Sequence, residues 1–99
     1  MRALILALLL LGSDSRATSA HCVSLAWSAG TYSKSVTLRV WRQKNQNAYA
    51  QVQQLSNTAT TWTDTNVVAS ARYSYYLLAC DVKTKDCSAA SNIVTVSVP

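Results

Sequence analysis

Two segments near the end of the chain alternate between apolar and polar residues, and a short polar connection with a cysteine at each end joins them. The first segment is Tyr73–Cys80, and the second follows Cys87 to the end of the chain. An alternation with a period of two is typical of strands that bury one face. Six residues separate the cysteines, which allows a disulfide across the neck of an antiparallel hairpin. These features together predict a small all-β domain that closes on a stapled hairpin.

The cysteine pair has an alternative role as a redox or metal-binding pair. The CxxC spacing and the partner histidines that such sites use are missing. The structural bridge is the preferred interpretation, and closing so short a loop contributes roughly 2–3 kcal/mol of stability.

The chain starts with Met1-Arg2 and then runs from Ala3 to Leu11 without a polar residue. Nine apolar residues in a helix would reach only about half of a bilayer core, so a transmembrane span is disfavoured. A basic start, a short apolar core and small residues afterwards are typical of a secretory signal peptide. We predict a signal peptide over residues 1–20, cleaved after Ala20, with cleavage after Ala17 as the alternative.

Residues 21–99 then form one domain, exported to the periplasm or the extracellular space, with no transmembrane segment after processing. This part has seven basic and three acidic residues and no glutamate. A positive charge favours loose attraction to anionic surfaces. The basic residues are scattered rather than clustered, so no specific nucleic-acid partner is expected.

Further alternating segments lie before the hairpin. In the first, Val23, Leu25 and Trp27 share one face, and in the second, from Val36 to Gln43, Leu38 and Val40 do. A glutamine-rich strand and a short strand around Trp62 follow. Six or seven short strands separated by polar turns predict an immunoglobulin-like β-sandwich.

In order and spacing, these segments resemble the fibronectin type III domain. The matching motifs are Val23–Trp27 for strand B, Leu38–Arg42 for strand C, Thr61–Asp64 for strand E, Tyr73–Cys80 for strand F and Ser91–Val96 for strand G. The resemblance implies that Trp27 is the core tryptophan and that the Tyr73 hydroxyl bonds to backbone at the E–F corner. It also implies a bacterial extracellular type with a Cys80–Cys87 bridge.

The sequence departs from that family before Cys22, because cleavage after Ala20 leaves only His21 where strand A is expected. Either strand A is missing, or residues 18–21 form a stub of it, or the sequence start cuts off part of a longer protein. A missing strand A would leave a sheet edge open to strand addition. Cys22 is the odd cysteine: it could link two copies into a homodimer, stay free or carry a lipid, and His21 disfavours lipidation. A Cys22–Cys80 bridge is disfavoured, because both residues are out of phase with the core-facing sets.

No catalytic machinery is evident, so we predict that the protein is not an enzyme and uses no cofactor. His21 is the only histidine, too few for a copper brace or a metal site. The only acids of residues 21–99 are Asp64, Asp81 and Asp86, and the last two lie in the turn between strands F and G.

The best surface feature is the outward face of strands C and F, which should carry Arg39 and Trp41 beside Tyr76 and Leu78. Exposed aromatic and aliphatic side chains beside an arginine are suited to binding sugars or proteins, although such cross-strand pairs also stabilise sheets without any ligand. Lys83 and Lys85, in the turn between strands F and G, are further candidate contacts.

These features predict a secreted, non-catalytic fibronectin type III-like module for protein or surface interaction or for structural support. Its partner would be a protein or a cell-surface polysaccharide. The first alternative is a carbohydrate-binding accessory module of a secreted enzyme system. The second is an assembly subunit that oligomerises through an open sheet edge or Cys22.

Overall fold

The computed structural model describes the backbone of residues 8–14 and residues 21–28 and 30–99 in full. Seven strands follow one another along the described chain: β1 (Leu8–Asp14), β2 (Cys22–Trp27), β3 (Val36–Lys44), β4 (Ala50–Ser56), β5 (Thr61–Asp64), β6 (Arg72–Asp81) and β7 (Val94–Ser97). The described residues form no helix, so none of them makes a helical membrane span.

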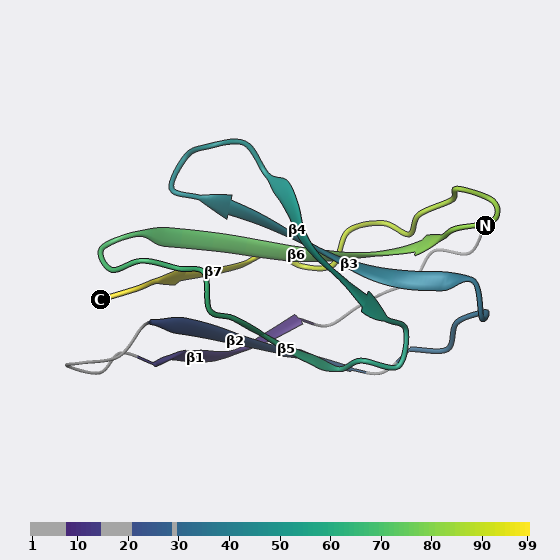
Figure 1. The fold of residues 1–99 in the computed structure, drawn as a ribbon, viewed down its shortest axis with the longest axis horizontal. Coiled ribbons are helices and arrows are strands. Elements are labelled where there is room, and N and C mark those ends of the chain that lie inside the picture. The colour runs from purple at the N-terminus through teal and green to yellow at the C-terminus, as the bar shows by residue number, and fades with distance from the viewer. Residues whose placement is uncertain (1–7, 15–20, 29) are drawn as a thin grey trace.

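The strands build two antiparallel sheets that pack face to face (Figure 1). One sheet has the order β1-β2-β5, and the other has the order β4-β3-β6-β7. The all-β sandwich predicted from the sequence is therefore confirmed. The glutamine-rich strand is β4, an edge strand as expected, and it pairs with β3 from Ala50 to Ser56.

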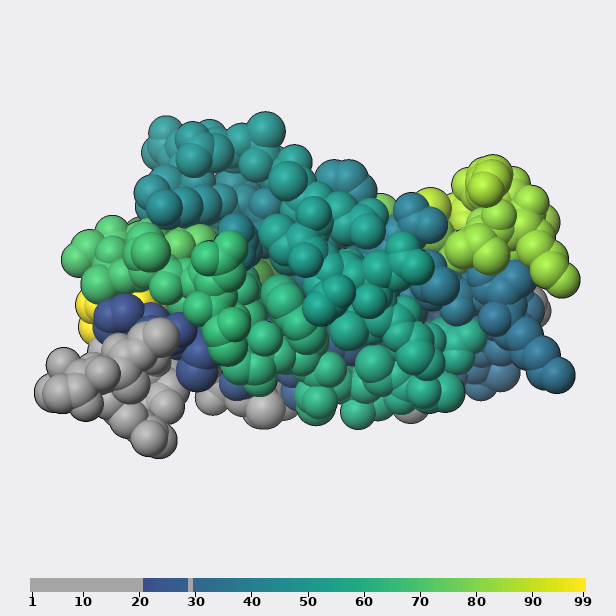
Figure 2. Space-filling view, viewed as in Figure 1, coloured from purple at the N-terminus to yellow at the C-terminus, as the bar shows by residue number. Residues whose placement is uncertain are grey.

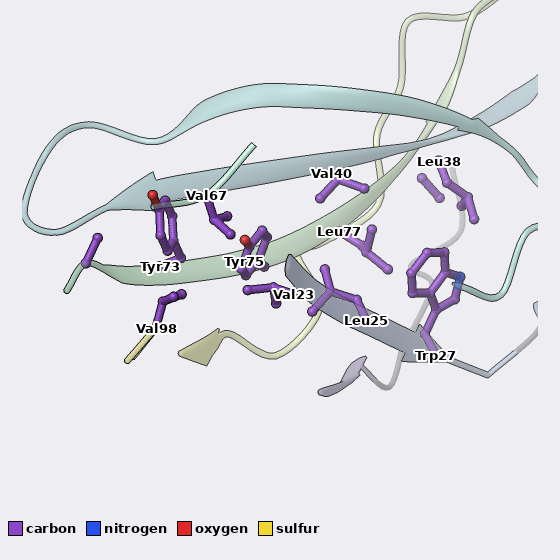
Figure 3. Packing of buried hydrophobic residues seen from close by; sticks show 12 residues of the cluster. Val23, Leu25, Trp27, Leu38, Val40, Val67, Tyr73, Tyr75, Leu77 and Val98 are labelled. Atoms are coloured by element: carbon purple, nitrogen blue, oxygen red, sulfur yellow. The ribbon is translucent and has the colours of Figure 1, made fainter. Parts of the chain in front are cut away.

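The core lies between the sheets and comes from the faces that the alternation assigned inward (Figure 3). β2 buries Val23, Leu25 and Trp27 in the predicted pattern. Opposite them lie the buried side chains of β3 and β6: Leu38, Val40, Tyr73, Tyr75 and Leu77. Burial of each large apolar side chain contributes about 1.5–3 kcal/mol. This shared layer is what joins the two sheets.

Two polar groups of core rings have hydrogen-bond partners on the backbone, and the one at the Tyr73 hydroxyl is the bond that the resemblance implied. The Trp27 indole Nε1 donates to the Ala59 carbonyl at 2.9 Å. The Val68 amide donates to the Tyr73 hydroxyl at 3.0 Å, which fixes the crossover between β5 and β6. Because a buried donor or acceptor without a partner is costly, both bonds hold their rings in one place.

The edge of β2 is occupied when residues 8–14 are present. β1 pairs antiparallel with β2, with Leu8 opposite Trp27 and Asp14 opposite Cys22, and fills the place of strand A. The expectation that strand A is missing is thus wrong for the uncleaved chain. β1 consists of residues that the sequence pattern assigned to the signal peptide. A leucine-rich segment can pair with the open edge of a sheet as well as serve as the apolar core of an export signal. Both expected cleavage points, after Ala17 and after Ala20, lie outside the described residues.

The last strand is shorter than predicted. The resemblance to the fibronectin type III domain placed the start of strand G at Ser91, whereas β7 begins at Val94. Before it, the chain still runs beside β6, but the Ser88 and Ser91 hydroxyls accept the Ala79 and Leu77 amides at 3.0 and 2.8 Å. Side-chain oxygens therefore replace the carbonyls of a regular ladder.

Candidate functional site

The outward face of the four-stranded sheet brings together the four residues predicted on strands C and F. Arg39 of β3 lies opposite Leu78 of β6, and Trp41 lies opposite Tyr76. All four side chains are half-buried. The register fixes these pairs, since residues directly opposite in an antiparallel pair have Cβ atoms about 5 Å apart.

The aromatic side chains of this face form a cluster. The Trp41 and Tyr76 rings are nearly parallel, at 4°, with centroids 6.2 Å apart. Tyr49, just before β4, adds a third ring tilted by 53° at 4.9 Å from Tyr76. We call Arg39, Trp41, Tyr49, Tyr76 and Leu78 the aromatic face. Tyr49 was not predicted as part of this face, because it lies in a loop, where alternation carries no signal.

Three polar atoms on the outward side of β3 are shielded from solvent without a hydrogen-bond partner: Thr37 Oγ1, Arg39 Nε and Trp41 Nε1. They lie at alternate positions of one strand and therefore on the same face. Buried polar atoms normally have a partner, from protein or water. The aromatic face thus holds hydrogen-bonding capacity that the described residues do not use.

Lys83 and Lys85 lie in the F–G turn (residues 81–86), beyond the Arg39 end of the aromatic face. Figure 2 shows this turn (lime) and the loop between β3 and β4 (teal) standing out at opposite ends of the molecule, and both lysines are exposed. The turn is held by Asp81, whose Oδ1 accepts the Lys83 amide at 2.8 Å and the Ser35 hydroxyl at 2.9 Å. These hydrogen bonds, that from the Lys83 amide first, lower the pKa of the Asp81 carboxyl.

The expected staple closes the same turn, as a disulfide between Cys80 and Cys87. Cys22 remains a free, half-buried thiol on β2. A structural disulfide favours an oxidising, non-cytoplasmic environment. Among the described residues, no group of three or more histidine, cysteine or acidic side chains is placed to hold a metal ion.

A buried ionic network that was not predicted from the sequence joins the two sheets. Arg42 Nη1 of β3 donates to Asp64 Oδ2 of β5 at 2.8 Å. The Tyr75 hydroxyl donates to the same oxygen at 2.8 Å, and the Asn66 amide donates to Oδ1 at 3.0 Å. The Arg42 guanidinium also lies 5.3 Å from the centre of the Tyr73 ring.

This network is structural in character. Burial first, and then the hydrogen bond to Asp64, raise the pKa of Tyr75 well above its ordinary value. Both Asp64 oxygens are engaged and the residue is buried, so the carboxylate is not presented to a substrate. The signal was present in the alternation: Arg42 is in phase with Leu38 and Val40, and an inward charge needs a partner.

Comparison with solved structures supports the architecture. No protein-family model matches the chain, and no curated protein does. Pectate lyase PelI from Erwinia chrysanthemi, in complex with tetragalacturonic acid, superposes with a TM-score of 0.70 at 20% identity, covering 94% of this chain. The chain spans only 28% of the length of that lyase.

Two structures of similar length have the same fold. The fibronectin type III domain of human fibronectin type III domain containing protein 3 superposes with a TM-score of 0.61 at 16% identity, covering 92% of this chain and 85% of that domain. A myokine structure gives a TM-score of 0.61 at 17% identity, covering 91% and 95%. At these identities the likeness concerns the fold, and the fold is that of a fibronectin type III-like β-sandwich.

Proposed function

We propose that this chain is a secreted, non-catalytic module that attaches to a partner protein or to a polymer surface through its aromatic face. The observation that carries the proposal is the cluster of Trp41, Tyr49 and Tyr76 on the outward side of β3 and β6. Half-exposed aromatic rings offer a large contact area at low entropic cost and are enriched in binding surfaces.

Carbohydrate binding, as an accessory module of a secreted enzyme system, is the second candidate. It is supported by the likeness to the pectate lyase PelI, a far longer chain that was solved with tetragalacturonic acid. Flat aromatic rings beside arginine are suited to pack against a sugar ring and to bond its oxygens. A small fold shared with part of a polysaccharide lyase is compatible with a role in positioning rather than in cleavage.

The test compares retention of the wild type and of Trp41→Ala on insoluble pectate, cellulose and chitin and on immobilised extracellular proteins. Val68→Ala is the matched control, because Val68 is an exposed apolar residue outside the aromatic face. We expect Trp41→Ala to lose at least one interaction that Val68→Ala keeps. Equal retention of both variants would refute the assigned surface, and release of reducing sugar from a polymer would refute the non-catalytic role.

A role as an assembly subunit is the third candidate, and the free Cys22 thiol supports it. Removal of residues 1–20 would take β1 away and open the edge of β2 beside this thiol. The exported protein should then form a dimer that reductant or Cys22→Ser abolishes. A monomer at high concentration under oxidising conditions would exclude this role.

A further inference from the structure

A polar groove continues the aromatic face toward the end of the sheet nearest the loop between β3 and β4. It has a volume of about 390 Å³, within the range of small-molecule sites. We call it the amide groove, and its lining residues are Gln43, Asn45, Gln46, Arg72, Ser74 and Thr95.

The register makes the two regions one continuous strip. The pair Arg39 and Leu78 is followed by Trp41 and Tyr76, and then by Gln43 opposite Ser74. Arg72 lies two residues beyond Ser74 on β6 and therefore on the same face. Six residue steps separate Leu78 from Arg72. At a rise of about 3.3 Å per step, the strip is roughly 20 Å long.

The groove is held in shape by its own backbone. Asn45, at a left-handed φ of 54°, donates its amide to the Arg72 carbonyl at 2.6 Å. Its Oδ1 accepts the Arg72 amide at 3.0 Å. The Ser74 and Thr95 hydroxyls bond each other at 2.8 Å. The floor and one end of the groove are therefore organised before any ligand arrives, which lowers the entropic cost of binding.

The donors that face this groove are uncommitted. The side chains of Gln43 and Gln46 and the Arg72 guanidinium make no hydrogen bond or ion pair with any described residue, and Asn45 uses only its oxygen. The acids of residues 21–99 lie elsewhere: Asp64 is buried in the core, and Asp81 and Asp86 are in the F–G turn. The strip therefore presents amides and two arginines without a compensating carboxylate.

We propose that this strip binds a carboxylated polysaccharide, with sugar rings packed on Trp41 and Tyr76 and a carboxylate on Arg72. Arginine and carboxylate form charge-assisted, bidentate hydrogen bonds, and free amides suit hydroxyl oxygens. Two arginines at opposite ends are too few for a nucleic acid, whose binding depends on many phosphate contacts. This inference rests on the proposed role of the aromatic face and adds the class of ligand.

The test titrates the exported protein with polygalacturonate and with its fully methyl-esterified form, which has the same backbone without the charge. Arg72→Gln removes the charge and keeps an amide, and Lys34→Gln removes an equal, exposed charge outside the strip. We expect Arg72→Gln to weaken polygalacturonate binding about tenfold or more and to leave the esterified polymer unaffected. Lys34→Gln should change either affinity less than twofold. Trp41→Ala should lose both polymers.

Other outcomes separate the two proposals. If Arg72→Gln binds both polymers as well as the wild type does, and Trp41→Ala binds neither, the carboxylate site is overturned and the aromatic face is kept. An equal effect of Lys34→Gln would also overturn it, because net charge alone would then explain binding. Loss in Arg72→Gln but not in Trp41→Ala would overturn both proposals, because the strip binds sugar rings on the aromatic face. Failure of the wild type to bind either polymer would overturn this inference, while retention on an extracellular protein would preserve the proposed function. Melting temperatures of all variants confirm that each one folds.

Discussion

The network around Asp64 offers a sharp test of what joins the two sheets. Asp64→Ala removes an ion pair to Arg42, a hydrogen bond from the Tyr75 hydroxyl and one from the Asn66 amide. Removing one partner of a buried pair costs about 3–5 kcal/mol, because it leaves an uncompensated charge. The Arg42 side chain is 17% exposed and can recover some hydration, so the lower end, about 3 kcal/mol, applies.

That loss is a large share of the 5–15 kcal/mol by which a small domain is stable. The loss of unfolding free energy in Asp64→Ala is measured by urea unfolding, monitored by tryptophan fluorescence, with the midpoint and slope fitted together. Asp86→Ala is the matched control, since Asp86 is an exposed carboxylate in the F–G turn, and it should change stability by less than about 0.5 kcal/mol.

A double variant separates charge from packing. Arg42→Met with Asp64→Leu removes both charges at similar volume and should cost less than Asp64→Ala alone. A loss below about 1 kcal/mol in Asp64→Ala, or a larger loss in the double variant than in the single one, would refute the network as the link between the sheets.

Three further outcomes are expected. Replacing Cys80 and Cys87 together by serine should lower the free energy of unfolding by about 2.5 kcal/mol, read from urea midpoints; no change would mean that the bridge does not constrain the unfolded chain. Tyr73→Phe leaves the Val68 amide without its acceptor and should cost about 1–3 kcal/mol, with faster hydrogen exchange at that amide. The pKa of Asp81 is lower in the folded protein than in the unfolded chain, so its contribution to stability is present above the unfolded pKa and is lost as pH falls through the folded pKa. An NMR titration of the Asp81 carboxyl should show the lowered pKa. An ordinary pKa would contradict the hydrogen bonds of the turn.

Much of the fold could be predicted from local pattern. Alternation assigned Val23, Leu25 and Trp27 to one buried face of β2, and all three are buried there. The same pattern placed Trp41 and Tyr76 on the outward face of β3 and β6, and the register of the two strands then sets them opposite each other. A period of two is a property of the strand backbone itself, so it can be read without knowledge of the partner strands.

The tertiary structure decided which distant residues meet. Arg42 and Asp64 lie 22 residues apart on different sheets, and only sheet-on-sheet packing brings them to 2.8 Å. Tyr49 joins Tyr76 because the loop between β3 and β4 carries it there, and no alternation applies within a loop.

The sequence by itself determined the presence of the strands from β2 to β7, the buried face of β2 and the cysteine-stapled hairpin, because each depends on neighbours along the chain. The structure decided that β1 covers the edge of β2, that serine hydroxyls delay the start of β7, and that the amide groove continues the aromatic face. These features depend on register and on contacts between segments far apart in the chain. A hydrophobic pattern restricts such contacts but does not specify them.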